Sequence, residues 1–75
     1  MTPTDRDWLR RFAAELGVRE PTEDEIQSLL ALAATAAHAS ERTAAPLTCW
    51  LVGVAGTDPA EAHATAERLA AELGS

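Results

Sequence analysis

The chain has 75 residues, a formal net charge of −6 and six basic residues, all of them arginine. This acidic balance argues against nucleic acid as a ligand, because nucleic-acid binding depends on cationic contacts to phosphate. It argues against anionic membrane surfaces for the same reason. Hydrophobic residues make up 47% of the chain, but many of them are alanine, so we expect one small domain over residues 1–75 with a marginally stable core.

The cellular location can be predicted from the same composition. The single cysteine excludes an internal disulfide. The start of the chain, from Thr4 to Asp7, is polar and charged, unlike a signal peptide. The longest uncharged run, residues 44–56, contains Pro46 and is too short to span a membrane. We therefore expect a cytoplasmic protein.

A first helix is predicted over residues 5–16. Thr4 and Asp7 stand in the positions of a capping box, and Gly17 is suited to the left-handed conformation that ends a helix. The large residues between them follow a helical repeat that predicts one buried stripe. It consists of Trp8, Leu9, Phe12, Ala13 and Leu16.

A second helix is predicted over residues 23–39, with Thr22 and Glu25 as a stronger capping box. Its predicted stripe consists of Ile26, Leu29, Leu30, Ala33 and Ala37. Leu32 and Ala36 widen this stripe, so we expect the helix to touch more than one neighbour. Acidic residues gather at its start, where they compensate the positive end of the helix dipole and aid solubility. A metal site or a site for a cationic partner is the alternative for this cluster, which consists of Glu20, Glu23, Asp24 and Glu25.

A third helix is predicted over residues 46–56, with Pro46 in its first turn. A strand is the alternative, because a short apolar run cannot be assigned by periodicity alone. The chain offers no second strand to pair with it, and its large residues recur at i, i+3, i+4 and i+7, the helical spacing. We expect this helix to be the centre of the fold, with Gly53 allowing a close helix contact and Gly56 ending the helix.

A fourth helix is predicted over residues 59–73, because Asp58 is a good cap and Pro59 suits the first helical position. Short connections join the four segments. The sequence therefore predicts an all-α fold, a compact bundle of four helices with the third helix central.

Two patterns suggest chemistry. Gly53 to Asp58 is a G-x-x-G turn before a helix, but a dinucleotide fingerprint needs G-x-G-x-x-G after a strand. His38, Cys49 and His63 are possible metal or nucleophile residues, but their spacing matches no zinc pattern. Cys49 is better explained as a small apolar residue, and His63 as a surface residue that pairs with Glu67. We expect no catalytic residues, no cofactor and no metal.

The junction between the second and third helices carries a family resemblance. Ala37-His38, Glu41-Arg42, residues 44–48 and Leu51-Val52-Gly53 resemble a small, mostly actinobacterial domain of unknown function. Domains of this kind occur alone or joined to proteins resembling molybdenum-cofactor guanylyltransferases, and many carry a molybdopterin-guanine dinucleotide biosynthesis label. The resemblance implies an association with that pathway and a guanylyltransferase-like partner, but it supplies no catalytic residues.

We therefore expect a non-catalytic accessory or protein-interaction domain. Two alternatives remain open: a small-ligand or nucleotide-binding module that uses the Gly53–Asp58 turn and Arg42, and a homodimerisation domain, suggested by the thin core. The predicted interaction surface consists of His38, Glu41, Arg42, Thr48 and Trp50.

Overall fold

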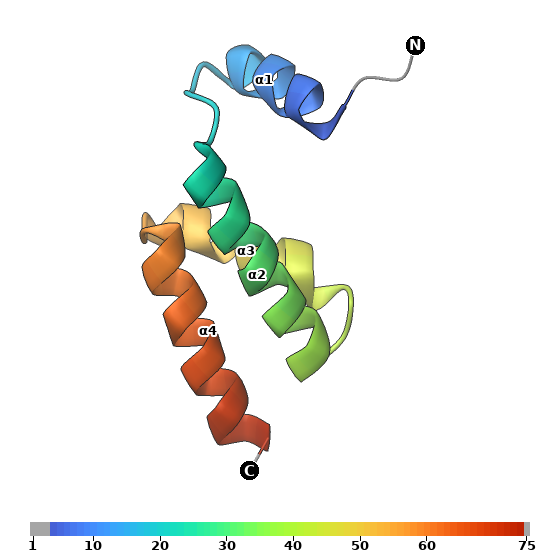
Figure 1. The fold of residues 1–75 in the computed structure, drawn as a ribbon, viewed down its shortest axis with the longest axis vertical. Helices are drawn as coiled ribbons and strands as arrows, with labels where there is room; N and C mark the ends of the chain where they lie inside the picture. Colours follow the sequence, from blue (N-terminus) through green and yellow to red (C-terminus); the bar gives the residue numbers. More distant parts are fainter. Residues whose placement is uncertain (1–3, 75) are drawn as a thin grey trace.

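A computed structural model of the chain describes residues 4–74. It contains four helices and, within the described part, no strand: α1 (Asp5–Leu16), α2 (Glu23–Ala39), α3 (Ala44–Ala55) and α4 (Pro59–Gly74) (Figure 1). The prediction of an all-α bundle of four helices is confirmed. The bounds of α1 and α2 are those predicted and α4 is one residue longer. α3 begins two residues earlier and ends one residue earlier than expected.

The helix ends follow the capping residues in the sequence. Thr4 and Thr22 each accept a hydrogen bond from the backbone N–H three residues on, and both capping boxes are complete. Gly17 and Gly56 end α1 and α3 with φ values of 74° and 67°, in the left-handed region where glycine has no steric penalty. The carboxylate of Asp58 accepts hydrogen bonds from the first backbone N–H groups of α4.

The earlier start of α3 is tolerated because of the place that Pro46 takes. Pro46 becomes the third residue of the helix rather than the first. The first four backbone N–H groups of a helix have no acceptor within it, so the N–H that proline lacks is still no loss. Thr43, which precedes α3, makes no capping bond through its side chain.

The centre of the fold is α2, so the expectation that the third helix is central is wrong. α2 packs against both α4 and α3, and Figure 1 shows α4 beside it with α3 crossing behind. Thr35 on α2 also donates a hydrogen bond to Glu67 on α4, with 2.6 Å between the oxygens. The reason is in the side chains: α2 supplies the buried large residues Ile26 and Leu32, whereas α3 has no buried residue.

The interior is small. In the described part of the chain only four hydrophobic residues are buried, and two of these, Ala13 and Ala62, are alanines. Among the described residues, Leu32 is the one large side chain that is almost completely buried, with 1% of its surface exposed. α1 contributes little to the interior. Within its predicted stripe, Ala13 is buried and Leu9 is half-buried, but Trp8 and Phe12 are exposed.

α1 lies apart from the body formed by α2, α3 and α4 (Figure 1). Its position is set at a charged corner at the start of α2. Arg6 on α1 makes a two-pronged contact with Glu23, at 3.0 and 3.2 Å. The radius of gyration of the chain is 13.4 Å, against about 11 Å expected for a globular domain of this length.

Candidate interaction surface

The feature that distinguishes α3 from the other helices is an exposed apolar face on a helix without a charged residue. Four large side chains recur at helical spacing on one side of α3, and each is 59–67% exposed. They are the same residues whose spacing predicted a helix, which we expected at the centre of the fold. We call them the outward face of α3: Leu47, Trp50, Leu51 and Val54.

The opposite side of α3 consists of smaller residues. Ala45, Thr48, Cys49 and Val52 are half-buried, and they recur on the side of the helix away from the outward face. Because α3 packs against α2, these small side chains make the contact within the chain. A helix that is apolar all round needs cover on both sides, and this chain covers only one of them.

The predicted interaction residues do not form one surface. His38, Glu41 and Arg42 are exposed at the end of α2 and in the connection that follows, as expected for an accessible junction. Trp50 is exposed, but Thr48 is half-buried. Two residues that are two positions apart on a helix point about 200° apart around its axis, so Thr48 and Trp50 lie on different faces of α3.

The other members of the outward face were missed because the third helix was expected to lie at the centre of the fold. Leu47, Leu51 and Val54 repeat with Trp50 at helical spacing, and such a repeat does not tell which neighbour covers it. The signal that could have revealed them was size. Large residues gather on one side of this helix and small ones on the other, so a tight contact was available on the small side.

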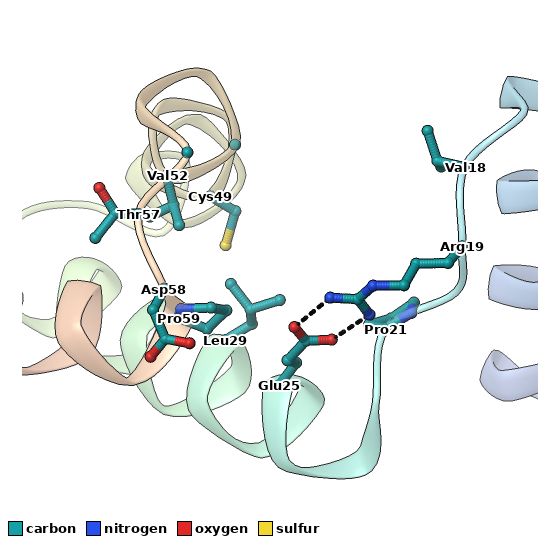
Figure 2. A pocket seen from close by; sticks show the side chains of 12 residues that line it. Val18, Arg19, Pro21, Glu25, Leu29, Cys49, Val52, Thr57, Asp58 and Pro59 are labelled. Carbon is teal, nitrogen blue, oxygen red and sulfur yellow. Dashed lines mark hydrogen bonds and ion pairs between the residues drawn. The ribbon is translucent and has the colours of Figure 1, made fainter.

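Gly53 and the turn after α3 border an open groove of about 720 Å³ (Figure 2). Gly53 makes no close helix contact, contrary to the expectation, because a Cβ added there would meet nothing within 4 Å. Gly56 ends the helix, as predicted. The groove is lined by residues of α2, of α3 and of the two connections beside them.

The groove does not assemble the predicted nucleotide site. The carboxylate of Asp58 already accepts the N–H groups at the start of α4, where a phosphate would otherwise bind. Arg42 lies before the start of α3, and at 1.5 Å per residue that start is about 14 Å along the helix from Gly53. Arg19 does line the groove, but its guanidinium pairs with the carboxylate of Glu25, both contacts being 2.7 Å (Figure 2).

Basic residues pair with the acidic cluster at the start of α2. Arg19 and Glu25 form a bidentate ion pair, and Arg10 lies 3.7 Å from Glu20. The hydrogen bonds from Arg19, with that from the backbone N–H of Thr22, lower the pKa of Glu25 to about 2. The negative charges of the cluster therefore balance the arginines and the positive end of the helix dipole. The described residues include no group of three or more ligands that could hold a metal.

His38, Cys49 and His63 do not come together. His63 contacts Glu67 at 3.1 Å, the pair predicted one helical turn apart. Cys49 is half-buried on the side of α3 away from the outward face, and burial raises the pKa of its thiol. A raised pKa keeps the thiol protonated and unreactive, as expected for a small apolar residue.

A second exposed apolar cluster lies on α1. The rings of Trp8 and Phe12 stack, with 5.6 Å between their centroids, and both are exposed. Charged residues stand beside them, since Asp7, Arg11 and Glu15 line the same depression. This cluster is therefore apolar in part, whereas α3 has no charged residue at all.

Comparison with known proteins gives one match. A family model described as "Domain of unknown function (DUF6457)" matches residues 2–75, which includes all four helices. The chain belongs to this family. No curated protein and no solved structure matches it significantly. Within the described residues, no helix is long and apolar enough to cross a membrane.

Proposed function

We propose that this DUF6457 domain is a non-catalytic protein-interaction module that docks through the outward face of α3. One observation carries the proposal: four large apolar side chains, each 59–67% exposed, on a helix without a charged residue. Exposed apolar surface gathered in one place is typical of a site for another protein. Tryptophan, here Trp50, is among the side chains most enriched at the centres of interfaces.

We extend the proposal to molybdenum-cofactor biosynthesis, with the domain working in the cytoplasm beside a guanylyltransferase-like protein. Its support is the resemblance carried by the junction between α2 and α3. His38, Glu41 and Arg42 are exposed there, next to the start of α3. In the described part of the chain, the side chains of Arg42 and Glu41 make no hydrogen bond or ion pair. Both are therefore free to contact a protein that binds the outward face of α3. Polar rims around apolar centres are usual in interfaces.

The test measures the mass of the complex in solution. The full chain is studied alone and mixed with a purified guanylyltransferase-like protein, as wild type and as Leu51→Glu. We expect Leu51→Glu to abolish self-association, binding of the guanylyltransferase-like protein, or both, because it places a charge within an apolar contact. Arg42→Ala should weaken binding of the guanylyltransferase-like protein, and Arg11→Ala, which removes another exposed arginine, should not.

Two results would count against the proposal in different ways. If the wild-type chain associates with neither itself nor the added protein, the interaction function is wrong. If it associates with itself but never with the guanylyltransferase-like protein, only the link to molybdenum-cofactor biosynthesis is lost.

A further inference from the structure

We infer that the outward face of α3 is covered by a second copy of this chain, with α3 packed against its counterpart about a two-fold axis. This inference rests on the proposed function, because it names the occupant of the same docking face. Its basis is the exposed area of the chain, the distribution of charge and the small interior.

The exposed area of the chain exceeds that of a compact monomer. The chain exposes 5788 Å², whereas a compact monomer of 7.9 kDa is expected to expose about 4,400 Å². The excess is about 1,400 Å², and a standard interface buries about 800 Å² on each partner. A single interface of ordinary size would therefore remove more than half of this excess.

The charge distribution selects α3 as the centre of that interface. Each copy carries a net charge of −6, so two copies repel each other in most orientations. A two-fold contact brings a surface against itself, so any charge near the axis meets its own counterpart. α3 has no charged residue and avoids this repulsion, whereas the apolar cluster on α1 has Asp7, Arg11 and Glu15 beside it.

The small interior favours a second copy over a different protein. Ile26 and Leu32 are the only large buried side chains among the described residues. A domain with so little core depends on its partner for stability, and a second copy is present wherever the chain is made.

The chain's own α1 is a poorer cover for the outward face. Arg6 and Glu23 hold α1 at the start of α2, through contacts of 3.0 and 3.2 Å. α1 lies apart from α3 in the single chain (Figure 1), and cover by a second copy leaves this two-pronged ion pair in place.

The test compares two leucines of nearly equal exposure on different helices. Leu51 on α3 is 59% exposed and Leu30 on α2 is 60% exposed. Sedimentation of the full chain from about 1 to 100 µM covers the range in which a micromolar Kd is visible. We expect wild type and Leu30→Glu to be dimers at the upper end, and Leu51→Glu and Leu47→Glu to be monomers throughout. Circular dichroism checks that the variants are helical.

Tryptophan fluorescence reports on the interface itself. Trp8→Phe leaves Trp50 as the only tryptophan of the chain. We expect the emission of Trp50 to lie at short wavelength in the dimer and to move to longer wavelength on dilution, since Trp50 is 67% exposed in the single chain. If the charged variants lose their helices, thermal unfolding of the wild type at several concentrations replaces them. The midpoint temperature rises with protein concentration for a dimer and stays constant for a monomer.

Several outcomes overturn the inference. The inference is wrong if the wild type is a monomer at all concentrations. This includes a monomer in which the chain's own α1 covers Trp50. A dimer that survives Leu51→Glu but not Leu30→Glu places the contact elsewhere. If the wild type is monomeric yet binds a guanylyltransferase-like protein in a manner that Leu51→Glu abolishes, the second copy is wrong and the interaction function stands. If no association responds to Leu51→Glu, both are wrong.

Discussion

α2 and α3 lie against each other, yet they place their large apolar side chains in opposite ways. α2 directs Ile26 and Leu32 into the interior, whereas α3 leaves Trp50 and its neighbours on the surface and turns smaller residues toward α2. The two helices also differ at their starts, since α2 has a complete capping box and charged partners and α3 has neither. The difference indicates that α2 holds the single chain together, while the large side chains of α3 stay uncovered within it.

The strongest test of this comparison is within α2. Leu32→Ala should lower the free energy of unfolding by about 2–5 kcal/mol, because it opens a cavity at the most buried side chain of the fold. Leu30→Ala, two residues away and 60% exposed, should change it by less than about 0.5 kcal/mol. Urea unfolding followed by circular dichroism measures both. Equal losses would mean that the outer side of α2 is also an interior surface.

The end of α3 gives the next largest effect. Gly56→Ala should destabilise the domain by about 1–2 kcal/mol, because alanine is strained in the left-handed conformation at φ 67°. Gly53→Ala, in the same helix, should instead stabilise it by about 0.5–1 kcal/mol, since glycine in a helix interior is unfavourable. A Cβ at either position meets nothing within 4 Å, so backbone conformation is the only difference tested. Thermal unfolding of the pair should show shifts of opposite sign.

The starts of α2 and α3 can be compared through two threonines. Thr22→Ala should cost about 1 kcal/mol, because it removes the side-chain oxygen that accepts the N–H of Glu25. Thr43→Ala removes no such bond and should change stability by less than about 0.5 kcal/mol. The same unfolding measurement serves for both variants. A similar loss at Thr43 would show that the start of α3 is stabilised in some other way.

The smallest effect concerns the pH dependence of the ion pair between Arg19 and Glu25. The pKa of Glu25 is lowered from 4.5 to about 2, so the stabilisation from its ionised carboxylate is fully present above about pH 4.5 and is lost as the pH falls toward 2. Titration of the Glu25 carboxyl by NMR should give a midpoint near 2 in the wild type. Arg19→Ala should move that midpoint up, because the guanidinium is the largest cause of the shift. If the midpoint is the same in the wild type and in Arg19→Ala, the ion pair is not formed in solution.

Much of the fold could be predicted from local signals. The capping boxes at Thr4 and Thr22 and the left-handed glycines at positions 17 and 56 act over a few residues, so they set the helix bounds without knowledge of the neighbours. The early start of α3 was missed because Pro46 was placed at the first helical position, whereas it is the third residue of the helix.

The candidate site could be predicted only in part, for a different reason. The exposed junction at His38, Glu41 and Arg42 was identified from polarity, which tends to correspond to exposure. Thr48 and Trp50 were grouped by closeness in the sequence, although a helix separates residues two positions apart onto different faces. The outward face of α3 was taken for core because large apolar residues are usually buried.

The amino-acid sequence by itself determined that this chain forms four helices, where most of them begin and end, and that α3 is apolar on every side. Only the tertiary structure decided which side of α3 is covered within the chain. Both sides are apolar, so hydrophobicity does not separate them. Close packing does, because the small residues around Thr48 and Cys49 allow α2 to approach, and this leaves the outward face of α3, with Trp50 among its residues, uncovered within the chain.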